Sequence, residues 1–171
     1  MKSIVIYYSR SGENYVNGHI QNLAKGNTEY IAEFLKEDFG ADLFKAETTK
    51  EYARSYMDCI REAQKELDNG ERPALKAELP DLSGYDTVFI AGPCWWGTYP
   101  MAIFSAIEGK DFSGRKVCPI MTHEGSGLGH CEGDLQKALP GAQFVKGLAI
   151  HGADAARSRQ TVKNWVEKNV L

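Results

Sequence analysis

Short apolar runs alternate with longer amphipathic stretches along the chain, and this alternation restricts the fold more than any other feature of the sequence. Several runs lack the polar residue at every second position that a half-exposed strand shows, which indicates strands buried on both faces. A parallel sheet covered by helices on both sides has this pattern. The sequence therefore predicts an α/β fold. The expected strands are Ser3 to Tyr8, Ala41 to Ala46, Thr87 to Ala91, Lys116 to Met121 and Gln143 to Ile150.

The amphipathic stretches that follow the strands are expected to be helices. In the first of them, Ile31 and Leu35 lie on one side, and Gly40 follows the stretch as a common helix stop. The sequence has no internal repeat or low-complexity segment, and its 171 residues are typical of one domain, so residues 1–171 are predicted to form a single domain. The expected helices are Thr28 to Phe39, Glu51 to Leu67, Tyr99 to Ile107, Gly129 to Leu139 and Ala153 to Val170.

The charge balance and the lengths of the apolar runs exclude several classes of partner. The chain has 20 Lys and Arg against 23 Asp and Glu, a formal net charge of −3, whereas nucleic-acid binding requires a clustered surplus of cations. Apolar runs such as Thr87 to Ala91 are far shorter than the roughly 20 residues that cross a bilayer. The start of the chain shows no targeting pattern. We therefore expect a cytoplasmic protein that binds neither nucleic acid nor membrane, with its four cysteines as free thiols.

Ligands of open parallel sheets bind beyond the carboxyl ends of the strands, so the loops after the first, third and fourth expected strands carry the candidate site. The first loop contains Ser9 and Ser11, and Asn27 and Thr28 begin the helix that follows it. Unpaired N–H groups at such a helix start favour a phosphate, and the hydroxyls add further partners. An Asn or Thr that only caps the helix is the structural alternative. The chain has no ATP-type or dinucleotide-type glycine motif, which disfavours those ligands.

The loop after the third expected strand combines glycine with large aromatic rings. It contains Pro93, Trp95, Trp96 and Gly97. Aromatic faces suit stacking on a planar ring, and a glycine allows the backbone a positive φ. Adjacent residues of an extended segment point in opposite directions, so one tryptophan is expected to pack inward while the other faces the loop or solvent. Exposed aromatic residues also occur at protein interfaces, and that alternative stays open.

The loop after the fourth expected strand is rich in glycine. It contains Thr122, His123, Gly125 and Gly127, and its backbone groups suit hydrogen bonding to the polar edge of a heterocycle. His123 is either a general acid or base or a histidine whose hydrogen bonds are satisfied within the loop. The spacing of the histidines and cysteine in this region fits no standard zinc pattern, so no metal site is expected.

Together, the motifs of the three loops resemble the flavodoxin family, and the resemblance covers nearly the whole chain. It is closest to the bacterial branch in which an insertion, here Gly12 to Lys25, interrupts the phosphate loop. The family implies a flavodoxin-like three-layer sandwich with a five-stranded parallel sheet in the order 2-1-3-4-5, and a tightly held FMN. By this resemblance, the FMN phosphate would be held by Ser9, Ser11, Asn27 and Thr28, and the isoalloxazine would lie between Pro93, Trp95, Trp96 and Gly97 on one side and Thr122, His123, Gly125 and Gly127 on the other.

The resemblance implies an electron carrier in which the flavin performs the redox chemistry and redox proteins are the partners. An NAD(P)H-dependent quinone or FMN reductase on the same fold, acting on NAD(P)H and a small acceptor, is the alternative, and a flavin-free interaction domain is a further one. The chain departs from the family pattern at Arg10, a cation inside the phosphate loop, and at Glu124, where relatives carry glycine. A monomer or a small homo-oligomer is expected.

Overall fold

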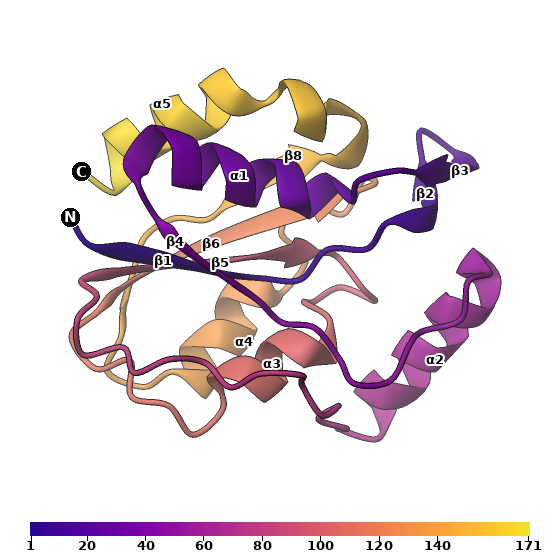
Figure 1. Ribbon diagram of the computed structural model, residues 1–171, viewed down its shortest axis with the longest axis horizontal. Coiled ribbons are helices and arrows are strands. Elements are labelled where there is room, and N and C mark those ends of the chain that lie inside the picture. Colours follow the sequence, from indigo (N-terminus) through magenta and orange to yellow (C-terminus); the bar gives the residue numbers. More distant parts are fainter.

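A parallel sheet between two layers of helices forms the centre of the protein in the computed structural model, which describes residues Met1 to Leu171 (Figure 1). The strands of this sheet have the order β4-β1-β5-β6-β7, and β8 also pairs with β6. This is the expected order 2-1-3-4-5, with the fifth expected strand in two pieces. The strands are β1 Ser3–Tyr7, β4 Asp42–Lys45, β5 Thr87–Pro93, β6 Lys116–His123, β7 Gln143–Phe144 and β8 Leu148–His151.

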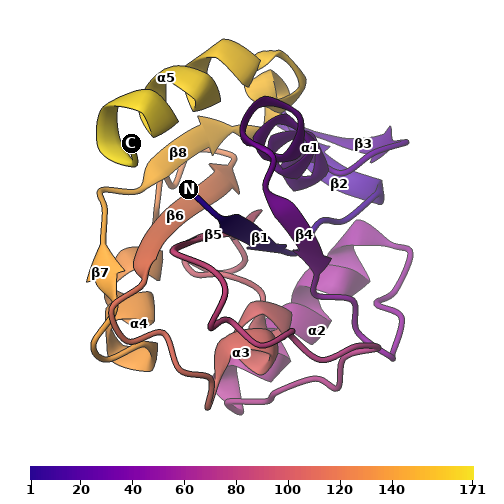
Figure 2. The same ribbon diagram turned by 60° about the vertical axis from the view of Figure 1, so that its left-hand side comes forward.

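Two helices cover each face of the sheet, and a fifth helix lies beyond its edge (Figures 1 and 2). Side chains alternate between the faces along each strand, so Val5 packs beneath α1 and α5, whereas Ile4 and Ile6 pack toward α3 and α4. None of the helices has the length and apolar composition that crossing a bilayer requires. The helices are α1 Asn27–Phe39, α2 Tyr56–Asp68, α3 Met101–Ile107, α4 Cys131–Ala138 and α5 Arg159–Asn169.

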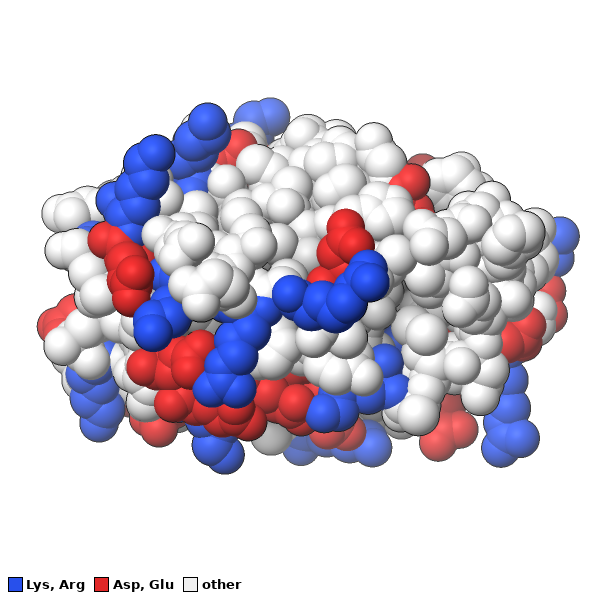
Figure 3. All heavy atoms as spheres, turned by 90° about the horizontal axis from the view of Figure 1, so that it is seen from above, with Lys and Arg blue, Asp and Glu red and all other residues white.

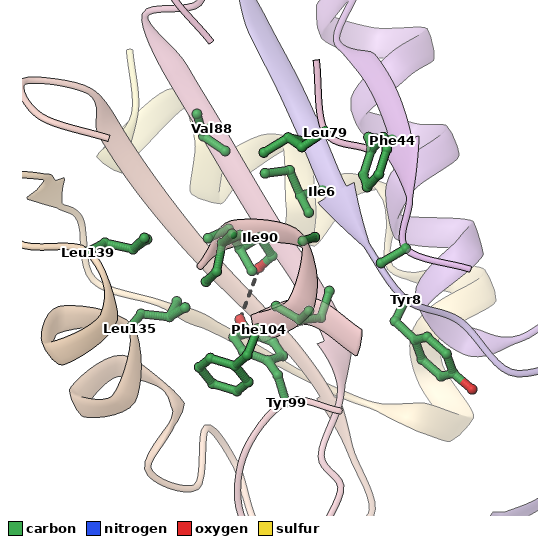
Figure 4. Close-up of a cluster of buried hydrophobic side chains, with 14 of the residues drawn as sticks. Ile6, Tyr8, Phe44, Leu79, Val88, Ile90, Tyr99, Phe104, Leu135 and Leu139 are labelled. Atoms are coloured by element: carbon green, nitrogen blue, oxygen red, sulfur yellow. Dashed lines mark hydrogen bonds between the residues drawn. The ribbon is translucent and has the colours of Figure 1, made fainter. Parts of the chain in front are cut away.

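Tyr99 connects two central strands from inside the core (Figure 4). Its hydroxyl lies 3.0 Å from the carbonyl oxygen of Ile90 and 2.9 Å from that of Ile120, and the side chain is fully buried. Burial raises the pKa of Tyr99 well above its usual value, so the hydroxyl remains a donor. A Tyr99→Phe variant is therefore expected to lose about 1–3 kcal/mol of unfolding free energy in urea. An unchanged denaturation midpoint would show that the hydroxyl contributes nothing.

The expectation of one continuous strand from Gln143 to Ile150 is wrong. Pro119 of β6 has no N–H to offer to a neighbouring strand, so the ladder is interrupted there and resumes at Ile120, which pairs with Leu148 of β8. The backbone groups at the break find side-chain partners instead. The Lys146 carbonyl accepts a hydrogen bond of 3.1 Å from the Trp165 indole, and the Gly147 N–H donates one of 3.0 Å to the Glu132 carboxylate.

Two expected helices begin later than predicted. In the expected helix Glu51 to Leu67, the regular structure starts after Ser55, whose hydroxyl accepts a hydrogen bond from the Asp58 N–H and caps α2. In the expected helix Ala153 to Val170, a six-residue 3-10 turn comes first, and α5 begins after Ser158. The remaining helices start and end within two residues of the expected positions.

The stretch that interrupts the first loop forms a hairpin of two antiparallel strands, β2 Gly12–Val16 and β3 His19–Leu23. Its tip is Asn17-Gly18, with φ of 52° and 80°. Positive φ at both central residues is typical of the tight turns that join twisted strands, and Asn-Gly is the preferred pair there. The hairpin lies at the end of the molecule opposite the two chain termini (Figure 1).

Candidate functional site

A cavity of about 390 Å³, called here the main cavity, lies at the carboxyl ends of β1, β5 and β6. This volume is within the range of small-molecule and cofactor sites. A more polar cavity of about 560 Å³, the side cavity, lies next to it. Three predicted site residues, Gly97, Gly125 and Gly127, line neither cavity, and Ser9 and Ser11 line the side cavity. The main cavity brings together the predicted residues Asn27, Thr28, Pro93, Trp95, Trp96, Thr122 and His123.

The loop after β1 packs directly on the start of α1. The Ser9 hydroxyl accepts a hydrogen bond of 3.1 Å from the N–H of Glu29 in the first turn of the helix. A Cβ at Gly26 would lie 2.2 Å from the Ser9 hydroxyl oxygen and 2.6 Å from the Arg10 carbonyl oxygen. The close approach of the two segments therefore depends on the absence of a side chain at Gly26.

Asn27 and Thr28 do not cap α1 with their side chains. The N-cap residue is Gly26, and no side-chain cap bond is formed there. The buried Thr28 hydroxyl instead lies 2.9 Å from the Thr122 hydroxyl, which connects α1 to β6. The start of the helix thus faces the main cavity with hydroxyl, amide and backbone N–H groups, which is a donor set that suits an anion.

The two tryptophans of the loop after β5 point in different directions, as the sequence predicts. Trp95 packs edge-to-face on Tyr8 and Tyr52, with ring centroids 5.0 Å and 5.2 Å away. Trp96 is 45% exposed, and its indole N–H donates a hydrogen bond of 2.8 Å to the Ile60 carbonyl of α2. One ring therefore fixes the loop on the core, and the other borders the main cavity and solvent.

The turn at Trp96 and Gly97 has positive φ at both residues, 58° and 89°. The Gly97 carbonyl accepts a hydrogen bond of 2.8 Å from the His130 N–H, and a Cβ at Gly97 would lie 2.8 Å from the His130 Nε2. The Asp134 carboxylate accepts a hydrogen bond of 2.6 Å from the Thr98 hydroxyl and lies 2.6 Å from the His130 Nδ1. These contacts hold a backbone conformation that is unfavourable for Trp96.

The guanidinium of Arg10 joins the base of the hairpin to the segment before α2. Its Nε donates to the Glu13 carbonyl at 2.9 Å, and one terminal nitrogen donates to the Ala53 and Arg54 carbonyls at 3.0 Å each. These bonds give the cation in the first loop a structural function, and its charge remains at the wall of both cavities.

The carboxylate of Glu124 lines the main cavity near the start of α1. Its Oε2 accepts a hydrogen bond of 2.9 Å from the Asn17 N–H and lies 3.8 Å from the His151 Nε2. A Cβ at Gly152 would lie 2.6 Å from the Glu124 Oε1 and 2.7 Å from the Asn27 side-chain nitrogen. The Glu124 carboxylate and the Asn27 amide therefore both lie against Gly152. Glu124 therefore ties the hairpin tip to the end of β6 and places a negative charge in the cavity wall.

The structure supports the interpretation of His123 as a histidine satisfied within its own loop. Its Nδ1 accepts a hydrogen bond of 2.9 Å from the Gly125 N–H, which requires an unprotonated nitrogen. Burial lowers the pKa of His123, and His151 acts in the same direction, while Glu124 opposes both. The neutral imidazole thus holds the loop that borders the cavity.

Sequence analysis missed the side of the main cavity that is formed by the hairpin and α2. The rings of Tyr15 and Tyr56 stack there, with centroids 5.9 Å apart and planes at 22°. The apolar stripe of α2 was the available signal: its first part lines the cavity, whereas Leu67 at its end packs against the core. The α2 residues in the cavity wall are Tyr56, Cys59, Ile60 and Ala63.

Charged side chains of both signs mix over the α1 and α5 side of the molecule, and a broad uncharged area with charged side chains at its edge extends toward the end that carries the hairpin (Figure 3). This mixture agrees with the small net charge of −3. No strong field of one sign covers this face, so electrostatic steering of a charged partner toward it is weak.

Comparisons with known proteins agree with the fold. A family model described as flavodoxin matches residues 2–169. A candidate flavoprotein from Bacteroides uniformis has 30% identity and a TM-score of 0.76, with 98% of each chain covered. Another from Bacteroides eggerthii has 25% identity and a TM-score of 0.78, covering 99% of this chain and 98% of that one. A flavoprotein from Lactobacillus acidophilus in complex with FMN has 17% identity and a TM-score of 0.65, with coverage of 91% and 97%. No curated protein sequence matches significantly.

Proposed function

The chain belongs to the flavodoxin family, and from that premise we propose that it binds FMN in the main cavity and transfers electrons through the bound flavin. One observation carries the proposal: a single cavity combines an anion-binding helix start with four aromatic rings. The similarity of the fold to a flavoprotein that is in complex with FMN supports the same choice of cofactor.

The residues present fit FMN. We assign the phosphate to the start of α1, with the backbone N–H groups of Asn27 and Thr28 as donors. The Ser9 hydroxyl accepts from Glu29 and keeps its own proton available for donation. We assign the isoalloxazine to the aromatic side of the cavity at Trp95 and Trp96. Thr122 and His123, with Gly125 and Gly127 next to the cavity, are proposed to border its polar edge. Pro93 completes the cavity wall, Gly97 acts through the turn that carries Trp96, and Ser11 approaches from the side cavity.

The protein binds and orients the cofactor, and bound FMN supplies one- and two-electron chemistry. The contacts of His130 and Asp134 fix the turn that carries Trp96. Glu124 keeps a negative charge in the wall, which raises the free energy of any further negative charge placed in the cavity.

The proposal is tested by FMN uptake. The purified protein is stripped of flavin by mild denaturation and dialysis, refolded, and titrated with FMN while flavin fluorescence and the visible absorption bands are recorded. We expect saturation at one FMN per chain. Absence of uptake at micromolar FMN would overturn the proposal.

The carrier and the NAD(P)H-dependent reductase differ in the source of their electrons. The sequence carries no nicotinamide fingerprint, which favours the carrier. The aromatic side chains that line the main cavity suit a flat second ligand, which keeps the reductase as a second candidate. Anaerobic stopped-flow mixing with NADPH separates the two, because rapid bleaching of the flavin selects the reductase. Slow or absent bleaching, with rapid reduction by a protein reductase, selects the carrier.

A Gly97→Ala variant is expected to shift the one-electron midpoint potentials of the bound flavin. The added Cβ would meet the His130 ring, and alanine disfavours the φ of 89°, so the turn that carries Trp96 must move. If the strain energy of the turn differs by about 1 kcal/mol between two oxidation states of the flavin, the one-electron midpoint potential shifts by roughly 40 mV. The measurement is a redox titration with reference dyes.

Gly109→Ala is the matched control for this prediction. Gly109 has a similar φ of 74°, but no atom lies within 4 Å of its added Cβ. We expect Gly109→Ala to reduce stability slightly and to leave the potentials unchanged. Equal potentials in the Gly97→Ala protein and the wild type would contradict the role assigned to this turn.

A further inference from the structure

Glu66 of α2 is the only charged side chain that is buried in the protein, with 2% of its surface accessible. Its Oε2 accepts a hydrogen bond of 2.7 Å from the Tyr52 hydroxyl, and its Oε1 pairs with the Lys50 ammonium. The ammonium compensates the negative charge, as the burial of a carboxylate requires. The charge-assisted hydrogen bond therefore holds the Tyr52 hydroxyl against a group that can take its proton.

Tyr52 belongs to a group of three aromatic rings that joins the two cavities, called here the aromatic cluster and defined as Tyr8, Tyr52 and Trp95. Trp95 lines the main cavity, whereas Tyr8 and Tyr52 line the side cavity. The Trp95 centroid lies 5.0 Å from that of Tyr8 and 5.2 Å from that of Tyr52. At these edge-to-face distances the rings are in contact. The aromatic cluster therefore forms a continuous path between the cavity assigned to the flavin and the side cavity.

The two tyrosines of the aromatic cluster differ in what their hydroxyl groups face. The Tyr8 hydroxyl points away from the other labelled core side chains, toward the side cavity, and donates to no carboxylate (Figure 4). Burial raises the pKa of both tyrosines, and the contact with Glu66 raises that of Tyr52 further, so both hydroxyls keep their protons. A tyrosine that loses an electron becomes strongly acidic and must release this proton. Only Tyr52 has a carboxylate in place to receive it.

No other tyrosine combines these two features. The hydroxyls of Tyr7 and Tyr85 also donate to carboxylates, at 3.2 Å and 2.7 Å, but neither residue lines the main cavity or belongs to the aromatic cluster. Tyr15 and Tyr56 do line the main cavity, yet their rings stack on each other and neither hydroxyl donates to a carboxylate. Ring contact with the cavity wall and a proton acceptor on the hydroxyl therefore occur together only at Tyr52.

We propose that the aromatic cluster is a one-electron relay that carries an oxidising equivalent from the main cavity through Trp95 to Tyr52, with the Glu66 carboxylate as the acceptor of the Tyr52 proton. The proposal rests on the proposed function, because the oxidant is FMN excited by blue light in the main cavity. The excited flavin takes one electron from Trp95, and Tyr52 returns one electron to Trp95. The hydroxyl proton of Tyr52 passes to Glu66.

The products of the relay are flavin with one additional electron, a neutral radical on Tyr52 and a protonated Glu66. The total charge is unchanged, because the flavin gains one negative charge and the carboxylate loses one. The Lys50 ammonium lies 5.1 Å from the centroid of the Tyr52 ring and would repel a positive charge there, so the neutral radical is the favoured product. The cycle closes when the flavin returns its electron to Tyr52 and Glu66 returns the proton.

The test uses the FMN-loaded protein and a blue laser flash without oxygen. Flavin content is measured first by visible absorbance, and a protein that takes up no FMN would overturn the proposed function and the relay together. Transient absorption then follows the flavin and the radicals, and electron paramagnetic resonance of samples frozen under illumination identifies a tyrosyl radical. We expect this radical in the wild type, and we expect it to form more slowly in heavy water because a proton moves with the electron.

Tyr52→Phe is the informative variant, because it keeps the ring against Trp95 and removes only the hydroxyl. We expect loss of the tyrosyl signal and faster return of the electron from the flavin, since the charge separation then ends at Trp95. Tyr8→Phe is the matched control: Tyr8 contacts the same indole but donates to no carboxylate, so this variant should behave as the wild type. Glu66→Gln keeps an oxygen for the hydrogen bond but cannot take the proton, so the signal should also be lost. If Glu66→Gln does not fold, the effect of heavy water on the wild type tests the same step.

Three results would overturn the relay. The first is the absence of a tyrosyl radical in wild-type protein that carries FMN. The second is a tyrosyl signal of wild-type size in Tyr52→Phe, even if that variant melts at a lower temperature, because Tyr52 would then have a structural role alone. The third is loss of the signal in Tyr8→Phe, or equal rates of radical formation in heavy and ordinary water, since the hydrogen bond to Glu66 would then not direct the reaction.

Discussion

A Gly26→Ala variant is expected to bind FMN at least roughly 100-fold more weakly than the wild type while it remains folded. The φ of −64° and ψ of 151° at Gly26 are accessible to alanine, so the substitution adds no backbone strain. The new Cβ would instead overlap the Ser9 hydroxyl and the Arg10 carbonyl, at 2.2 Å and 2.6 Å. The loop must move away from α1. Two lost hydrogen bonds to a charged phosphate, at about 1.5–3 kcal/mol each, account for the expected loss.

FMN and riboflavin titrations of the same variant locate the effect. Riboflavin has no phosphate, so its affinity should fall much less than that of FMN. Gly133→Ala, in α4, is the matched control because no atom lies within 4 Å of its added Cβ. An equal loss of both ligands would place the damage at the ring instead of the phosphate. Wild-type affinity for FMN would refute the assignment of the phosphate to the start of α1.

The positions and burial of the strands could be predicted because both depend on patterns local to each segment, whereas the order of the strands was implied by the resemblance to the flavodoxin family. Every residue of β1 is buried, as its unbroken apolar run indicates. The break between β7 and β8 depends on Pro119 in a neighbouring strand and on side chains from α4 and α5. These partners are distant in sequence, so the Gln143 to Ile150 segment alone could not reveal the break.

The part of the site formed by the loops after the strands could be predicted from the sequence. The part formed by the hairpin and α2 could not. Switch-point topology places the loops after β1, β5 and β6 together, and the main cavity lies there. The hairpin had a local signal in Asn17-Gly18, which the expectation of an insertion from Gly12 to Lys25 did not use. The contacts of Arg10 with Ala53 and Arg54 and the stacking of Tyr15 on Tyr56 join segments about forty residues apart. No spacing rule specifies such pairs.

A Glu124→Gln variant is expected to bind FMN roughly tenfold more tightly than the wild type. The carboxylate lines the same cavity as Asn27 and Thr28, to which we assign the phosphate. Two like charges that face one partly solvated cavity repel by about 1–2 kcal/mol, which corresponds to the expected factor. A glutamine oxygen still accepts a hydrogen bond from the Asn17 N–H, so the link to the hairpin tip is retained.

Riboflavin separates the charge of Glu124 from its contacts. If Glu124 acts through repulsion of the phosphate, the variant gains affinity for FMN and not for riboflavin, and the gain shrinks as salt is added. Glu167→Gln, on the exposed face of α5, makes the same change in net charge away from the cavity and should leave both affinities unchanged. A parallel gain for FMN and riboflavin would mean that the substitution alters the hairpin or the ring site. Because only FMN carries the phosphate, the ratio of the two affinities measures the charge effect even if the hairpin moves.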